Sequence, residues 1–162
     1  MPSIATIGVY GFDRDSFLAA LAAAGVELVL DVRQRRGVRG SEYAWANAQR
    51  LQEALGEAGI AYSHLKELAP TTALREAQYR ADAERGEGKR SRTALSPVYV
   101  EGYTEQILDP VELEPILRWI GRQKAVLLCV ERDPEACHRS LVAARLRAEQ
   151  GFEVEDLRPD DS

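Results

Sequence analysis

The sequence predicts a single-domain α/β protein over residues 1–162, a three-layer sandwich with helices on both faces of a mostly parallel sheet of about five strands. Segments with strand composition alternate along the chain with segments of helical apolar spacing, which is the pattern of βα units. The runs VELVLDV (26–32) and AVLLCV (125–130) are almost continuously apolar, as expected of strands buried on both faces. A length of 162 residues with 45% hydrophobic content fits one domain with a substantial core.

Five segments have the length and composition of strands. They are residues 4–10, 26–32, 60–65, 125–130 and 152–157. The last of them alternates apolar and polar residues, which is typical of an edge strand.

The segments between these strands have apolar residues at helical spacing. Capping residues precede several of these segments, and glycines follow them. Serine or aspartate followed by proline recurs three times as a start signal. The expected helices run over 13–25 and 51–59, from Ser96-Pro97, from Asp109-Pro110, and from Asp133-Pro134 to just before Gly151.

Residues 71–95 are the least core-like part of the chain. Leu74, Ala77 and Ala81 form only a weak helical stripe, and the segment GEGKRSR (86–92) has no apolar residue. We therefore expect a mobile excursion over 71–95.

Charge and composition exclude several classes of protein. With a net charge of −5, the chain as a whole does not attract nucleic acid, so any such binding would be local. No apolar run approaches the roughly 18 residues of a membrane span, and the N-terminus does not read as a signal peptide. Two cysteines are too few for a secreted disulfide scaffold, and the expected location is cytoplasmic.

The sequence gives no reason to expect a metal or a cofactor. Its only cysteines and histidines are Cys129, Cys137, His64 and His138. They lack the paired spacing that is usual in structural zinc sites.

Ligands of such sheets bind beyond the carboxyl ends of the strands, where the loops into the helices converge. The segment CVERDPEACHRS (129–140) is the most informative one at this edge. A buried strand would deliver Cys129 and Glu131, and the first two turns of the following helix are expected to hold Cys137, His138, Arg139 and Ser140. A helix N-terminus beside Arg139 favours a phosphate or carboxylate, and the same field would lower the pKa of Cys137. Alternatively, the cysteines are structural and Arg139 pairs with an acid.

Asp31 and Arg33 end the neighbouring strand. The carboxylate would act as an acid or base while the guanidinium holds the same ligand, or the two would form an internal ion pair. His64 lies at the end of the third predicted strand. It would act as a proton carrier, or it would only form a hydrogen bond with a loop. The candidate catalytic residues are therefore Asp31, Glu131, Cys137 and His138, and the candidate ligand-binding residues are Gly8, Arg33, His64, Arg139 and Ser140.

Four segments carry a resemblance to a known family. TIG (6–8), LVLDVR (28–33), AGIAYSHLKEL (58–68) and LLCVERDPEACHRSLVAARL (127–146) resemble the bacterial and archaeal family named domain of unknown function 488. The resemblance implies a small cytosolic α/β protein without an established activity. The chain departs from the family at Gly8-Val9-Tyr10, where G-H-S is usual, and at Leu68-Ala69-Pro70, where a Leu-Gly pair is usual.

Three hypotheses of function remain, and they leave open whether the protein is an enzyme. The first is an anion-binding cleft, in an enzyme acting on a nucleotide-like or phosphorylated small molecule. The second is a nucleic-acid binding or processing module that uses the arginine loop 33–39, with Arg35, Arg36, Arg39 and Trp45 as contacts. The third is rhodanese-like sulfur or phosphoryl transfer through a cysteine.

Overall fold

The structure, a computed structural model, describes residues 2–88 and 91–159. Within these residues, one sheet has the strand order β3-β2-β4-β1-β5, and every neighbouring pair is parallel. The strands are β1 (Ser3–Gly8), β2 (Leu28–Asp31), β3 (Ala61–His64), β4 (Ala125–Cys129) and β5 (Glu153–Leu157). The predicted α/β class is confirmed, and β5 is an edge strand as its alternating pattern predicts.

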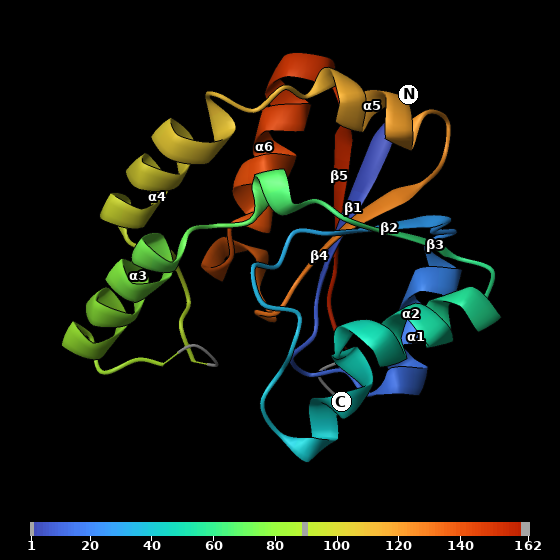
Figure 1. The fold of residues 1–162 in the computed structure, drawn as a ribbon, viewed down its shortest axis with the longest axis horizontal. Helices are drawn as coiled ribbons and strands as arrows, with labels where there is room; N and C mark the ends of the chain where they lie inside the picture. Colours follow the sequence, from blue (N-terminus) through green and yellow to red (C-terminus); the bar gives the residue numbers. More distant parts are fainter. Residues whose placement is uncertain (1, 89–90, 160–162) are drawn as a thin grey trace.

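Helices cover both faces of the sheet. In Figure 1, α1 and α2 lie on one side of the strands, and α3, α4 and α6 lie on the other. The helices are α1 (Arg14–Ala23), α2 (Ala48–Glu57), α3 (Thr72–Glu84), α4 (Pro97–Tyr103), α5 (Glu114–Ile120) and α6 (Arg139–Gln150).

The strand order opens a crevice between β2 and β4, which are neighbours in the sheet. The loop after β2 leads toward α2 on one face, whereas the loop after β4 leads toward α6 on the other (Figure 1). In open parallel sheets, adjacent loops that leave in opposite directions form the usual ligand crevice.

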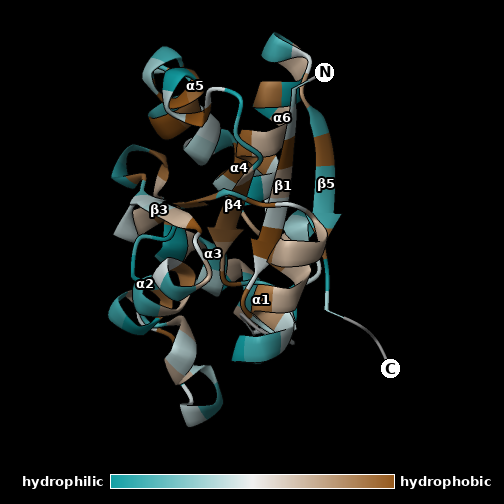
Figure 2. Ribbon diagram, turned by 90° about the vertical axis from the view of Figure 1, so that its right-hand side faces the viewer, coloured by the Kyte–Doolittle hydropathy of each residue, from teal (hydrophilic) through white to brown (hydrophobic). Residues whose placement is uncertain are grey.

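The hydrophobic core is built around the central strands. Every residue of β2 and β4 is buried, as the two continuous apolar runs predict. Figure 2 shows β4 in hydrophobic colours and the edge strand β5 largely in hydrophilic ones. Helix α1 contributes Phe17 and Leu21 to this core, at helical spacing.

Local capping signals fix several helix ends. The Asp13 carboxylate accepts a hydrogen bond from the Ser16 amide, and the Ser96 hydroxyl accepts one from the Tyr99 amide. Gly151 ends α6 with φ 70°, in the left-handed conformation that suits glycine. These predicted ends are confirmed.

Two predicted helix starts are wrong. Asp109 directly follows a π-helical turn, Thr104–Leu108, with helical φ and ψ, and its amide bonds to the Thr104 carbonyl, so it closes that turn and does not cap a new helix. Pro134 begins only a short 3₁₀ turn, Pro134–Ala136, because Cys137 is extended with φ −138° and ψ 145°. Helix α6 therefore starts at Arg139, and Cys137 and His138 lie before it.

The segment 71–95 contains more ordered structure than its composition suggests. Thr71 caps α3 by accepting a hydrogen bond from the Leu74 amide. This helix buries the polar side chains of Gln78 and Asp82, and Arg92 beyond it is buried as well. Residues 89–90 lie outside the described residues, and the mobility of the segment stays a prediction.

None of the helices within 2–88 and 91–159 has the length and apolar character needed to cross a membrane.

Candidate functional site

A small pocket of about 40 Å³ lies at the carboxyl ends of β2 and β4, and we call it the inner pocket. Helix α3 and the loop before α4 form its other walls. Its charged and sulfur-bearing lining residues are Arg33, Arg35, Arg75, Arg92, Cys129, Glu131 and His138. A larger cavity of about 620 Å³, the outer cavity, shares Arg35, Arg75, Tyr79 and Val130 with it. The two hollows therefore adjoin, and the inner one leads to a cysteine.

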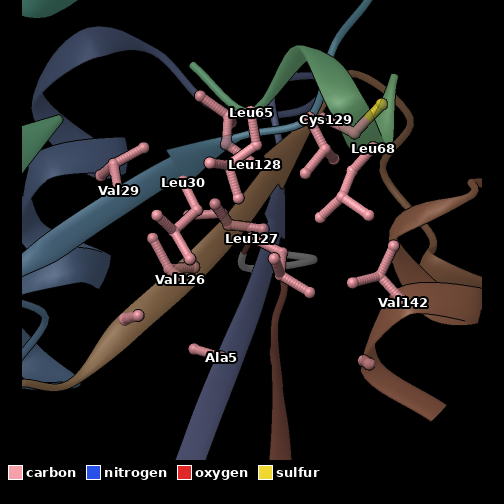
Figure 3. Close-up of a cluster of buried hydrophobic side chains, with 14 of the residues drawn as sticks. Ala5, Val29, Leu30, Leu65, Leu68, Val126, Leu127, Leu128, Cys129 and Val142 are labelled. Atoms are coloured by element: carbon pink, nitrogen blue, oxygen red, sulfur yellow. The ribbon is translucent and has the colours of Figure 1, made fainter. Parts of the chain in front are cut away.

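Two thiols and an imidazole lie together beside the inner pocket, which Cys129 and His138 line and Cys137 does not. His138 Nδ1 lies 3.7 Å from the Cys129 sulfur and 3.8 Å from the Cys137 sulfur. Figure 3 shows Cys129 at the end of β4, at the margin of the cluster of buried hydrophobic side chains. On the far side of the ring, Nε2 donates to the Val32 carbonyl at 2.7 Å, since a carbonyl can only accept. In the neutral ring, this bond leaves the Nδ1 lone pair facing both sulfurs.

The extended conformation of Cys137 produces this arrangement. It interrupts the chain between the 3₁₀ turn and α6, so that Cys137 and His138 both turn toward the end of β4. The Ser140 hydroxyl stabilises the break by donating to the Cys137 carbonyl at 2.8 Å. The amides of Leu141 and Val142 bond to the His138 carbonyl, so part of the predicted anion cradle at this helix start is occupied internally.

The two thiols of this cluster differ in acidity. Burial is the main cause that raises the pKa of Cys129 well above its ordinary value. Burial also opposes ionisation of Cys137, but a hydrogen bond from Cys129 and the charges of His138 and Arg139 lower its pKa well below the ordinary value. Burial disfavours the charged imidazole too, yet the Cys137 charge beside it raises the pKa of His138.

Asp31 and Arg33 form the internal ion pair that the sequence left as an alternative. Both are buried, and the guanidinium donates from Nε and Nη2 to the two carboxylate oxygens at 2.9 and 2.8 Å. The remaining acceptor positions of Asp31 bind the Arg33 amide and the Tyr62 hydroxyl, and Arg33 Nη1 donates to the Ala46 carbonyl. The hydrogen-bonding capacity of the carboxylate is therefore used within the protein.

Tyr62 should make stability depend on pH in the alkaline range. Burial, followed by the adjacent Asp31 charge, raises the pKa of Tyr62 from 10.0 to about 12. Because the pKa of Tyr62 is raised in the folded state, the neutral hydroxyl contributes its full share to the free energy of unfolding below pH 10. That contribution is lost as the pH rises toward 12. Denaturant unfolding in this pH window should show a steeper loss of stability in the wild type than in Tyr62→Phe. Equal slopes would contradict the assignment.

Glu131 is held by a buried polar network rather than left free. Its carboxylate lies 3.5 Å from Arg92 Nη2, and Arg92 Nε lies 3.2 Å from Asp82. Gln78 donates to Asp82 and accepts from the Ser96 amide, which joins α3 to the start of α4. The network fixes the α3 wall of the inner pocket against the end of β4.

Arg139 lies behind the pocket and not in its lining. It is fully buried, and its Nη1 and Nη2 donate to the carbonyls of Glu131 and Arg132 at 2.6 and 3.1 Å. Gly8 ends β1 directly beside this contact, because a Cβ there would lie 1.8 Å from the Glu131 carbonyl oxygen. Arg139 and Gly8 thus position the loop that carries Glu131.

His64 is not part of the inner pocket. Its Nε2 donates to the Arg33 carbonyl at 2.8 Å, and its ring lines a neighbouring cavity, which shares Gln34 and Pro70 with the inner pocket. This contact matches the predicted alternative of a loop hydrogen bond.

The four residues proposed as nucleic-acid contacts separate in the structure. Arg35 and Arg39 are exposed and both line the outer cavity. Arg36 instead donates to the Tyr62 hydroxyl, and Trp45 packs on Phe17 with ring centroids 5.0 Å apart. Trp45 therefore belongs to the core side of the loop.

Several pocket residues escaped the sequence analysis. Arg75, Gln78 and Tyr79 all come from the segment predicted as an excursion. Gln78 and Asp82 are four residues apart on the buried face of α3, and a search for apolar periodicity passes over such a polar stripe. The spacing of four residues between Gln78 and Asp82 was the sequence signal that could have indicated a polar contact on one face of a helix.

Comparison with known proteins gives a family but no individual relative. Neither the curated proteins nor the solved structures compared with this chain gave a match. A family model described as "Domain of unknown function DUF488" matches residues 13–146, which includes β2, β3, β4 and the whole thiol–imidazole cluster. The chain therefore belongs to the DUF488 family, as its sequence segments indicate.

Proposed function

We propose that the protein binds a small organic anion, carrying a phosphate or a carboxylate, across the inner pocket and the outer cavity. The observation that carries this proposal is the charge of Arg35 and Arg75, which line both hollows. Neither guanidinium forms an ion pair with a carboxylate of the described residues, whereas Arg33 and Arg92 both do. Uncompensated arginines favour an anionic guest, because the planar guanidinium binds oxyanions through paired hydrogen bonds.

The dimensions of the two hollows support a ligand with a small inner end and a larger outer part. The inner pocket, of about 40 Å³, takes only a few atoms, and the outer cavity of about 620 Å³ falls within the range of small-molecule sites. Arg75 is held in place by bonds to Gln34 and to the Tyr79 hydroxyl, and it also lies over the Tyr79 ring at 5.7 Å. Arg35, by contrast, is exposed and forms no hydrogen bond among the described residues. We therefore infer that the Arg35 guanidinium binds the anionic group directly.

Thermal unfolding in the presence of phosphate, nucleoside phosphates, sugar phosphates and carboxylates tests this proposal. A ligand at 100 times its Kd adds about 2.7 kcal/mol, which corresponds to a Tm increase of about 5–10 °C for a domain of this size. Arg35→Ala should weaken binding about tenfold or more, because a hydrogen bond to a charged group contributes about 1.5–3 kcal/mol.

Arg50→Ala is the matched control, since Arg50 is an exposed arginine of α2 that lines neither hollow. A stabilisation that survives both Arg35→Ala and Arg75→Ala would place the ligand elsewhere. No stabilisation by any compound of the panel would remove the support for this function. Binding of single-stranded nucleic acid that weakens steeply with salt would instead favour the alternative of a nucleic-acid surface.

A further inference from the structure

We propose that Cys129, Cys137 and His138 bind a thiophilic divalent metal ion, for which zinc is chemically the best suited. The two sulfurs and Nδ1 all lie within 4.8 Å of one another, and the three residues are buried. The unpaired sequence spacing led us to expect no metal. The fold supplies the ligand set without that spacing, by placing the loop before α6 against the end of β4. This site goes beyond the proposed function, because its ligands differ from the arginines that would hold the anion.

The two separations between His138 Nδ1 and the sulfurs are close to those of one tetrahedral ion. Zinc bonds of about 2.3 Å to sulfur and about 2.0–2.1 Å to nitrogen place neighbouring sulfur and nitrogen ligands about 3.5–3.6 Å apart. Here Nδ1 lies 3.7 Å from the Cys129 sulfur and 3.8 Å from the Cys137 sulfur. Small inward movements of the side chains would therefore bring all three atoms to bonding distance of one ion.

The orientation of His138 is the one that metal-binding histidines usually have. A ring nitrogen that binds a metal needs its lone pair free, and the other nitrogen is commonly held by a backbone carbonyl or a carboxylate. His138 Nε2 donates to the Val32 carbonyl at 2.7 Å, across the crevice between β4 and β2. The ring is therefore fixed with Nδ1 toward the sulfurs before any ion binds.

Glu131 borders the cluster on its Cys129 side. Its Oε2 is 3.5 Å from the Cys129 sulfur, but the group of atoms within 4.8 Å of one another contains only Cys129, Cys137 and His138. The proposed site therefore has three protein ligands, with the fourth tetrahedral position left for another ligand. Cys129 and Glu131 also line the inner pocket, which gives the ion a route to the site. A divalent ion would neutralise two buried thiolates, whose charge is otherwise costly away from water.

Cobalt(II) is the probe that separates this site from a pair of hydrogen-bonded thiols. The purified full-length chain is stripped of metal with a chelator and titrated with Co²⁺. We expect one ion per chain, a thiolate charge-transfer band in the near ultraviolet, and the intense visible bands of tetrahedral Co²⁺. The charge-transfer band reports these two residues alone, because the chain has two cysteines in all. Zinc should displace the cobalt and abolish the spectrum.

Variants assign the ligands. We expect the affinity for Co²⁺ to fall by at least about 100-fold in each of Cys129→Ser, Cys137→Ser and His138→Gln. Removing a group that only orients a ligand costs up to about 100-fold, and removing a ligand itself should cost at least as much. His64→Gln is the matched control, because His64 is the only other histidine of the chain and does not line the inner pocket. It should leave the spectrum unchanged. Arg35→Ala should also leave it unchanged, so failure of the anion proposal would not affect this test.

The wild-type protein keeps the test decisive if a cysteine variant does not fold. In the wild-type protein, Zn²⁺ should slow the alkylation of both cysteines. Mg²⁺ should not slow it, because Mg²⁺ prefers oxygen ligands. A six-coordinate cobalt spectrum, no binding, or a spectrum that persists in Cys129→Ser would overturn the proposal.

Discussion

Asp31→Asn is expected to lower the free energy of unfolding by about 3–5 kcal/mol, the usual cost of removing one partner from a buried ion pair. The substitution preserves the shape of the side chain but leaves the Arg33 charge uncompensated in a site where both residues are at most 1% exposed. It also turns an amide donor toward a guanidinium that can only donate. Equilibrium denaturation in urea measures the change.

A double-mutant cycle shows whether this cost belongs to the pair. Arg33→Met alone should be destabilising as well, because it leaves the Asp31 carboxylate buried without its cation. The combination Asp31→Asn with Arg33→Met should lose less than the sum of the two single changes, by about 2–3 kcal/mol. Strictly additive losses would show that the two charges do not act as a unit and would reopen a separate ligand-binding role for Arg33.

Gly8→Ala is expected to destabilise the fold by about 3 kcal/mol or more, at the upper end of overpacking effects. The added methyl group would lie 1.8 Å from the Glu131 carbonyl oxygen and 2.7 Å from its carbon. Both are backbone atoms, so no side-chain rotation relieves the clash. The chain after β4 would have to move, although Arg139 holds the same carbonyl at 2.6 Å. Urea unfolding, or loss of soluble protein, reports the effect.

Gly56→Ala provides the comparison. Gly56 lies within α2 and a Cβ there would meet nothing within 4 Å. Alanine should therefore stabilise the helix by about 0.5–1 kcal/mol. If Gly8→Ala proved as stable as wild type, the close approach of β1 to the Glu131 loop would not hold in solution.

Local sequence signals were sufficient for most of the fold. The apolar runs of β2 and β4 predict central parallel strands, because such strands are buried on both faces. Asp13 and Ser96 predict helix starts, since each cap is formed by a side chain and an amide three residues later. Two predicted helix starts, Asp109 and the Asp133-Pro134 pair, failed although they have the residue types of a helix start. Asp109 directly follows a helical turn, and the extended conformation of Cys137 ends the turn that Pro134 begins.

The candidate site was only partly predictable. That charged groups and thiols gather at the carboxyl ends of the strands follows from parallel topology, and the structure brings Glu131, Cys129 and His138 together there. Arg139, expected at the ligand, is instead buried against two carbonyls. The α3 wall was missed, because a helix that buries glutamine and aspartate has only a weak apolar stripe.

The sequence by itself determined the α/β class, the central strands and the edge of the sheet at which charged groups and thiols gather, because periodicity and capping act over a few residues. Only the tertiary structure decided which polar groups pair with one another. Asp31 binds its near neighbour Arg33, whereas His138 reaches the Val32 carbonyl, 106 residues away in sequence. The His138 contact depends on how strands and loops are placed in space, and no local pattern encodes it. The convergence of Cys129, Cys137 and His138 is a product of that placement.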